Sequence, residues 1–295
     1  MRLGIDWGGT KLEIIGMDGE GATLLRERVA TPKGDYAACI EAVKALVLSA
    51  ETKTGQAGTV GVGIPGTLSP ATGLVKNANS VWINGKPLKR DLETALGRAV
   101  RIQNDANCFA VSEAVDGAGD GFRVVAGIIL GTGCGSGIAI DGKALHGLNG
   151  IAGEFGHTPL PYMRVDEYPG GLCWCGKRGC LETWISGTGF ERDYETLIGQ
   201  PSPLSAMDIL ALDDPFSRKA YANYVDRLAR GLSQLVNMMD PDIIVLGGGM
   251  SNVASLCEDV EAAIVPFVFS DVFRTPVRVA RHGDSSGVRG AAWLW

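Results

Sequence analysis

One histidine and three cysteines form the most specific chemical pattern in this sequence. His157 is followed by a short loop that carries Cys173, Cys175 and Cys180, together with a Lys-Arg pair. Three cysteines and one histidine make a complete tetrahedral set for zinc, with no position left for a water. Three unrelated buried thiols are the alternative, but the Lys-Arg pair indicates a surface loop. The pattern therefore predicts a structural zinc rather than a hydrolytic one.

Three glycine-rich turns each follow an apolar run typical of a buried strand. Glycine lets backbone amides approach phosphate oxygens, and an aspartate nearby can help to hold magnesium. Any one of these turns could be a plain hairpin, and none has the Gly-Lys-Ser/Thr ending of a Walker A loop. Together they predict a nucleotide held between two lobes. The residues expected to contact it are Asp6, Gly8, Gly9, Thr10, Lys11, Gly131, Thr132, Gly133, Gly247, Gly248 and Gly249.

The pair Asn104-Asp105 lies between an expected strand and an expected helix. Asn and Asp are favoured as helix N-caps, so capping alone would explain both residues. A carboxylate at the carboxyl end of a strand is also where α/β folds place their chemistry. The residues by themselves leave both interpretations open for Asp105.

Two carboxylates flank the proposed zinc ligands. Glu154 lies three residues before His157, and Glu182 lies two residues after Cys180. A zinc ion would fix the loops that carry them, and carboxylates are good acceptors for sugar hydroxyls. Two solvated glutamates are the equally simple alternative.

The elements that must position these residues alternate between strand and helix patterns. Each half of the chain opens with strand, glycine turn and strand, which predicts an internal duplication and a mixed α/β protein of two lobes. We expect one lobe over 1–117 and a second over 118–295 that carries the zinc loop, with the closing segment 286–295 folding back on the first lobe. Strands are expected at 2–5, 11–17, 59–64, 100–102, 122–130, 136–140 and 242–246, and helices at 36–53, 88–96 and 106–115.

Composition narrows the class of partner. The net charge is −6 over 295 residues, and no run of Lys or Arg offers a footprint for nucleic acid. The uncharged stretch 124–140 contains five glycines, so strand–turn–strand is favoured over a membrane span. Seven cysteines without a secretory signal pattern fit a reducing compartment. We therefore expect a cytoplasmic protein that binds neither membrane nor nucleic acid.

Taken together, these motifs resemble the ROK family of bacterial sugar kinases along essentially the whole chain. The resemblance is strongest in Gly4–Lys11, Gly63–Gly66, Asn104-Asp105, Gly131–Gly133, the Glu154-x-x-His157 motif and the cysteine loop. Three further stretches are similar to the manno(fructo)kinase branch in particular: Val75–Ser80, Ser251-Asn252 and Gly283–Trp295.

The resemblance implies a two-lobe, actin-like (ribonuclease-H-like) fold and phosphoryl transfer from ATP to the 6-hydroxyl of a hexose, with magnesium. The branch implies fructose and also mannose as substrates, and a homodimer is expected. Asp105 would be the general base, and the metal ligands would be His157, Cys173, Cys175 and Cys180. The implied sugar-binding residues are Gly66, Asn104, Asp105, Glu154, His157 and Glu182.

Several other functions compete with this one. A kinase of the same family could instead use glucose or an N-acetylhexosamine, or take its phosphate from polyphosphate. A sugar-responsive repressor of the family is disfavoured, because its helix-turn-helix would precede the sugar domain and here the first glycine turn begins at Gly4. A zinc hydrolase is disfavoured, because four protein ligands leave the zinc no water to activate.

Overall fold

The computed structural model describes residues 1–295, apart from the side chain of Asp284. Its strands are β1 (Arg2–Trp7), β2 (Lys11–Met17), β3 (Thr23–Ala30), β4 (Thr59–Ile64), β5 (Thr67–Leu68), β6 (Val75–Lys76), β7 (Val100–Asn104), β8 (Val124–Leu130), β9 (Cys134–Ile140), β10 (Lys143–Ala144), β11 (Ile243–Gly247) and β12 (Val277–Val279). Its α-helices are α1 (Tyr36–Thr54), α2 (Leu88–Leu96), α3 (Asp105–Val115), α4 (Glu182–Ile185), α5 (Gly187–Ile198), α6 (Ala206–Leu212), α7 (Pro215–Met239), α8 (Leu256–Ile264) and α9 (Ser286–Ala292).

Two five-stranded sheets share one strand order. The first runs β3-β2-β1-β4-β7 and the second β10-β9-β8-β11-β12. When the five strands of each sheet are numbered by their order along the chain, both sheets have the strand order 3-2-1-4-5. The predicted internal duplication is therefore confirmed at the level of sheet topology, and the uncharged stretch 124–140 is strand, turn and strand as expected.

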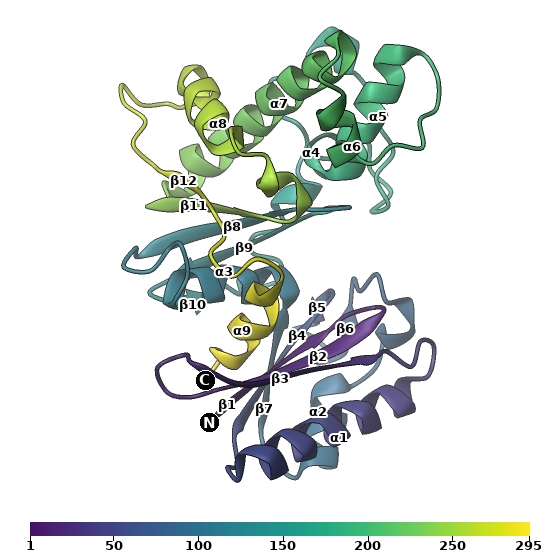
Figure 1. Cartoon of the computed structure of the whole chain (residues 1–295), viewed down its shortest axis with the longest axis vertical. Coiled ribbons are helices and arrows are strands. Elements are labelled where there is room, and N and C mark those ends of the chain that lie inside the picture. The colour runs from purple at the N-terminus through teal and green to yellow at the C-terminus, as the bar shows by residue number, and fades with distance from the viewer. The chain divides into compact units, whose positions relative to one another are not determined.

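The chain forms two compact units (Figure 1). The first comprises Met1–Arg123, Gly137–Gly153 and Asp284–Trp295, and the second comprises Val124–Ser136 and Glu154–Gly283. The first boundary at Arg123 lies close to the predicted one. The segment Gly137–Gly153 was predicted to belong to the second lobe, but its residues pack with the first unit. Gly137, for example, lies against the backbone of α3, where an added Cβ would be 2.5 Å from the carbonyl oxygen of Ala106.

In the first unit, strands β1, β4 and β7 are parallel. Helix α1 covers one face of this sheet (Figure 1), and its apolar side chains join the buried cluster that contains Leu3 and Ile5. The helix begins where the Asp35 side chain accepts a hydrogen bond from the Ala38 N–H, and it ends at Gly55 with φ 66°. Successive residues of a strand face opposite sides of the sheet, so Gly4, between Leu3 and Ile5, faces the side away from α1.

Helix α9 packs against that opposite face through glycines. A Cβ at Gly4 would lie 2.1 Å from the carbonyl oxygen of Val288, and one at Gly61 would lie 1.9 Å from that of Ala291. Only residues without a side chain allow the helix backbone to approach so closely. The expectation that the closing segment folds back on the first lobe is thus confirmed.

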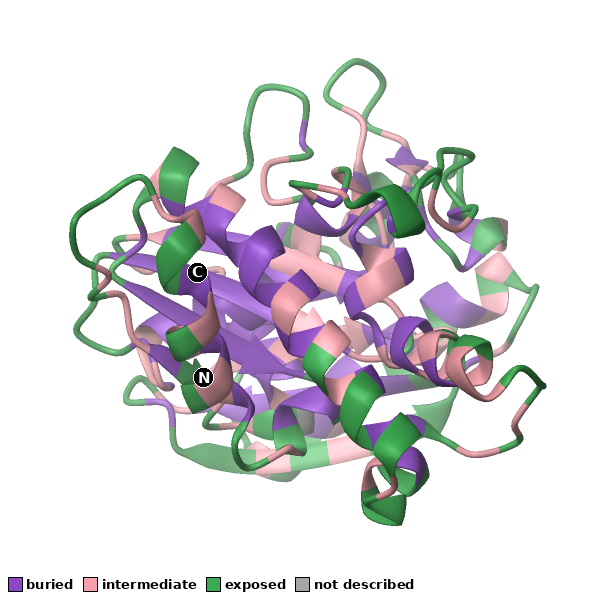
Figure 2. Ribbon diagram, turned by 90° about the horizontal axis from the view of Figure 1, so that it is seen from above, coloured by how far each residue is buried: buried purple, intermediate pink, exposed green. Residues whose placement is uncertain are grey.

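In the second unit, β8, β11 and β12 are parallel, and Gly247 pairs with Ile129 at the carboxyl end. Helix α7 is the longest helix among those described, and its buried face includes Tyr224, Leu228 and Leu232. Buried residues are concentrated along the strands, whereas the helices carry exposed residues on their outer faces (Figure 2). Among the residues that the structure describes, no helix combines the length and the apolar character needed to cross a membrane.

Candidate active site

The carboxyl ends of three parallel strands bring the first group of predicted site residues together. The register places Asp6 of β1 beside Gly63 of β4, and Gly63 beside Gln103 of β7. Asn104 ends β7, and Asp105, the predicted general base, begins α3 directly after it. In an α/β sheet this edge is where ligands bind. The first unit therefore gathers residues that the sequence separates by about a hundred positions.

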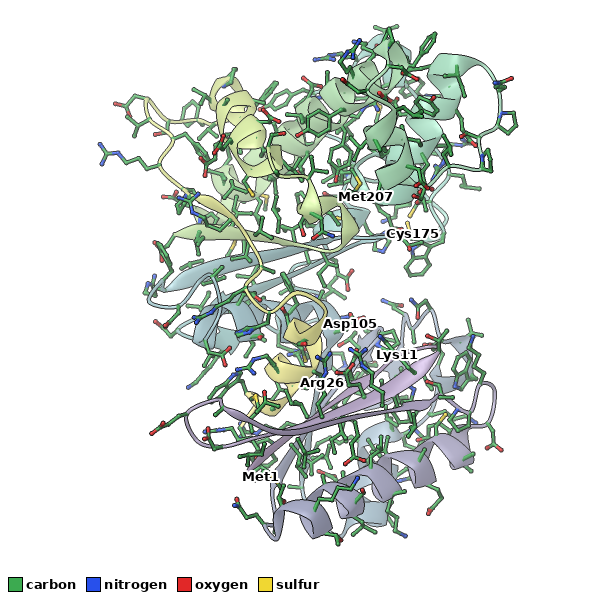
Figure 3. The ribbon with its side chains drawn as sticks, in the orientation of Figure 1. Met1, Lys11, Arg26, Asp105, Cys175 and Met207 are labelled. Carbon is green, nitrogen blue, oxygen red and sulfur yellow. The ribbon has the colours of Figure 1, made fainter. Side chains whose placement is uncertain are left out.

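Capping and candidate catalysis fall on different members of the pair. Asn104 is the N-cap of α3, because its Oδ1 accepts hydrogen bonds from the N–H groups of Ala106 (2.9 Å) and Asn107 (3.2 Å). Asp105 is the first residue of the helix and is half-buried, and its Oδ1 accepts a further bond from the Ala106 N–H at 2.8 Å. The side chain of Asp105 is labelled in Figure 3.

Gly66 lies in the left-handed region with φ 78°. A Cβ there would lie 2.4 Å from the carbonyl oxygen of Lys76 and 2.7 Å from the nitrogen of Ala78. Its carbonyl oxygen accepts a hydrogen bond from Nδ2 of Asn104 at 3.1 Å. The predicted sugar-binding residues Gly66 and Asn104 are thus in direct contact.

The first glycine turn joins β1 to β2. The Gly8 N–H donates to the carbonyl oxygen of Lys11 at 3.0 Å, and a Cβ on Gly8 would lie only 2.6 Å from that oxygen. The hairpin alone therefore explains Gly8. Gly9 is more open, since a Cβ there would meet only the hydroxyl of Ser80 at 3.2 Å. The stretch that ends at Ser80 lies beside the turn, a placement that the sequence did not predict.

Asp6 lies just before this turn, and its pKa is raised above the ordinary value of an aspartate. Burial, together with the nearby charge of Glu13, raises the pKa of Asp6 to about 6. The positive charges of Lys11 and Arg28 act in the opposite direction but do not outweigh the burial. A divalent cation beside Asp6 would stabilise its ionised form.

The predicted zinc ligands converge in the second unit. One ligand atom from each of His157, Cys173, Cys175 and Cys180 lies within 4.8 Å of all the others. Sγ of Cys173 is 3.5 Å from Nδ1 of His157, and the sulfurs of Cys175 and Cys180 are 3.6 Å apart. These separations suit ligands arranged around one tetrahedral ion, and the His-Cys₃ donor set fits zinc.

Both predicted carboxylates adjoin this cluster. Glu154 is exposed and immediately precedes the 3₁₀ turn Phe155–His157. Glu182 begins α4, and its Oε2 accepts a hydrogen bond from the Cys134 N–H at 3.0 Å, while its Oε1 lies 3.8 Å from Sγ of Cys173. One carboxylate thus lies three residues before the candidate histidine ligand, and the other lies two residues after the last candidate cysteine ligand.

The other two glycine turns meet at the carboxyl ends of β8 and β11. Gly248 has φ 82°, and a Cβ there would lie 2.6 Å from the carbonyl of Leu130 and 2.9 Å from the nitrogen of Gly131. Two turns that are more than a hundred residues apart in the sequence are thus in contact. A bulky residue at Gly248 would separate them.

Sequence reasoning missed the start of α5, which belongs to the same cluster of turns. The Gly187 N–H donates to the carbonyl oxygen of Gly131 at 2.7 Å, and Oγ1 of Thr188 donates to that of Thr132 at 2.8 Å. The available signal was the run Ser186-Gly-Thr-Gly189, in which Ser186 caps the helix by accepting from the Gly189 N–H.

Comparison with known proteins agrees with this geometry. The family model described as "ROK family" matches residues 2–295. N-acetyl-D-glucosamine kinase from Haemophilus influenzae is 42% identical, and the match covers this whole chain and 99% of that protein.

Two solved structures extend the comparison. The ROK hexokinase from Thermus thermophilus is 31% identical with a TM-score of 0.87, covering 99% of this chain and 97% of that one. The ROK family glucokinase from Streptomyces griseus, solved with glucose and AMPPNP, is 29% identical with a TM-score of 0.76, covering 99% and 98%. The predicted two-lobe sugar-kinase fold is confirmed. The chain belongs to the ROK family and is a sugar kinase of that family.

Proposed function

We propose that this protein transfers the γ-phosphate of ATP to the 6-hydroxyl of N-acetyl-D-glucosamine. The observation that carries the substrate is the 42% identity, over the full length, to the Haemophilus influenzae N-acetyl-D-glucosamine kinase. Identity to the hexokinase and the glucokinase is lower, at 31% and 29%. These relationships favour the alternative prediction, an N-acetylhexosamine, over fructose and mannose.

Asp105 is proposed as the general base. It stands at the carboxyl edge of the first sheet, at the start of a helix in which Asn104 accepts hydrogen bonds from the Ala106 and Asn107 amides. Its carboxylate would accept the proton of the sugar 6-hydroxyl as that oxygen attacks the γ-phosphorus in line. The bond from phosphorus to the β,γ-bridging oxygen breaks, and ADP leaves.

The glycine turns are proposed to bind the phosphates. Residues 8–11 of the first unit and residues 131–133 and 247–249 of the second offer backbone amides and hydroxyls at strand ends. Magnesium, when bound with ATP, would neutralise phosphate charge. Asp6, at the end of β1 and just before the first turn, is proposed to help hold it.

The residues proposed to contact the sugar are Gly66, Asn104, Glu154, His157 and Glu182. Zinc, held by His157 and the three cysteines, would stabilise the loop that carries Glu154, His157 and Glu182. The ion would have no open coordination position, so its contribution is structural.

A coupled ADP-release assay tests this proposal, with ATP and excess magnesium. It compares kcat/KM for N-acetylglucosamine, glucose, mannose and fructose. We expect N-acetylglucosamine to give the highest value. A higher kcat/KM for fructose or mannose would restore the manno(fructo)kinase prediction, and a lack of ADP release with every sugar would contradict the kinase proposal itself.

A further inference from the structure

Three hydrogen bonds hold the backbone of the glycine turn at 131–134 to the segment that follows the last proposed zinc ligand. The carbonyl oxygens of Gly131 and Thr132 accept hydrogen bonds from Gly187 N–H and Thr188 Oγ1. The Cys134 N–H donates to Glu182 at 3.0 Å. All of these supporting groups lie within eight residues after the last zinc ligand, Cys180.

The segment just before His157 also contacts the turn at 131–134 and the strand that leaves it. Gly156, the residue before His157, lies directly against the Cys134 carbonyl, where a Cβ would be 2.2 Å from the oxygen. The neighbouring Phe155 N–H donates to Oγ of Ser136 at 3.2 Å. The strand that leaves the turn is therefore fixed by the segment that supplies the histidine ligand.

The two supporting segments are joined to each other beside the four ligand atoms. The Leu181 N–H donates to the Thr158 carbonyl at 2.8 Å, and the Leu160 N–H donates to that of Gly179 at 3.0 Å. These two hydrogen bonds join the segment after His157 to the segment around Cys180, and both segments carry members of the His-Cys₃ cluster. An ion bound there would fix both segments relative to each other.

We infer that the His-Cys₃ cluster positions the 131–134 turn, so that zinc supports nucleotide binding as well as sugar binding. This inference rests on the proposed function, which assigns the turn to the phosphates. Glu182 is then a positioning residue for the turn in addition to its proposed contact with the sugar. The chain's own geometry links the metal cluster to the turn through Glu182, Gly156 and the start of α5.

Calorimetric binding of ADP tests the inference in the absence of sugar and with excess magnesium. Cys175→Ser removes a ligand that is exposed, and Cys257→Ser is the matched control, because Cys257 lies on α8 outside the cluster. We expect Cys175→Ser to lose zinc by elemental analysis and to raise the Kd for ADP at least about tenfold. Cys257→Ser should keep the zinc and the wild-type Kd. A zinc-free Cys175→Ser protein with an unchanged Kd would overturn the inference.

Hydrogen exchange provides a readout that needs no nucleotide. In Cys175→Ser, the amides of 131–136 should exchange faster, while those of the turn at 8–11 in the first unit should not change. Equal exchange at 131–136 with and without zinc would overturn the inference. If wild-type, zinc-loaded protein bound no ADP, the proposed function would fail, and the exchange result would still decide the inference.

Thr188→Val is a second variant that tests the inference if the cysteine variant does not fold. It removes one hydrogen bond to the turn while every zinc ligand remains. We expect it to retain zinc, to raise the Kd for ADP about fivefold and to accelerate exchange at 131–134. Unchanged values for both quantities would show that these contacts do not position the turn.

Discussion

The side-chain amide of Asn104 donates a hydrogen bond to the carbonyl oxygen of Gly66 at 3.1 Å. The same side chain caps α3 through its Oδ1. One residue thus fixes the end of β7, the start of α3 and the left-handed turn after β4. Asp105 follows directly, so the position of the proposed base depends on its neighbour.

Replacing Asn104 with Ala should reduce both stability and catalysis. The substitution removes the N-cap of α3 and the bond to Gly66, and losing a cap costs about 1–2 kcal/mol. Chemical denaturation measures that loss in the free energy of unfolding. Asn104→Asp is the control, because it keeps a capping oxygen but cannot donate to the Gly66 carbonyl. Equal stability of wild type and Asn104→Ala would contradict the capping role.

Replacing Asp105 with Asn should reduce kcat without unfolding the protein. General-base catalysis contributes about 10²–10⁴ in rate, and an amide cannot accept the proton. The Asn oxygen can still accept the bond from the Ala106 N–H. Steady-state kinetics with thermal melting checks both parts. A kcat near the wild-type value would remove Asp105 from the proposed mechanism.

Replacing Glu154 with Gln should affect the sugar more than the nucleotide. Glu154 is exposed beside the turn that carries His157, and a neutral amide is a poorer acceptor for a sugar hydroxyl than a carboxylate. We expect the KM for N-acetylglucosamine to rise several-fold more than the KM for ATP. Equal increases in both KM values would indicate that Glu154 supports the lobe rather than the ligand.

Glu167 should make the protein sensitive to acid. Burial by itself would raise the pKa of Glu167, but hydrogen bonds from Arg230, the Arg164 amide and Arg227 outweigh it and hold the pKa at about 2. Its folded pKa is therefore below the unfolded value of 4.5. The stability that it contributes is complete above the unfolded value and is lost as the pH falls toward 2.

Glu167→Gln tests this dependence, with the exposed Glu258→Gln as control. The Glu167 variant should be less stable at pH 7, because two largely buried arginines lose their carboxylate partner. It should also lose less stability than wild type between pH 5 and about pH 3. Parallel stability–pH curves for this variant and wild type would rule out Glu167 as the source of the acid sensitivity.

Two glycines on helix α9 should respond oppositely to alanine. A Cβ at Gly290 would lie 1.7 Å from the carbonyl oxygen of Cys108, whereas a Cβ at Gly287 has no atom within 4 Å. Gly290→Ala should destabilise the protein by about 1–3 kcal/mol or more, because the helix must move away. Gly287→Ala should stabilise it by up to about 1 kcal/mol through helix propensity. Similar unfolding free energies for the two variants would contradict this packing.

Sequence alone predicted most strands and helices of the first unit, because their patterns are strong and local. Helix α2 and strand β4 begin and end where the sequence placed them, and the α1 prediction differs by one residue. Helices α4 to α7 were not predicted. Their apolar residues pack against partners that are distant in sequence, such as Gly231 of α7 beside Leu181, where no local periodicity signals the contact.

For the site, sequence by itself determined which residues are candidates for the chemistry, since a His-Cys₃ set, glycine turns after strands and a strand-end Asn-Asp pair are recognisable from residue type and spacing. Only the tertiary structure decided how these candidate residues contact one another. It gave the capping role to Asn104 rather than Asp105, and it placed the turns at 131–133 and 247–249 in contact. It also attached the first of these turns to the segments of the His-Cys₃ cluster through Glu182 and Gly156. Such contacts join residues tens of positions apart, and their geometry depends on how the sheets and helices pack rather than on local sequence.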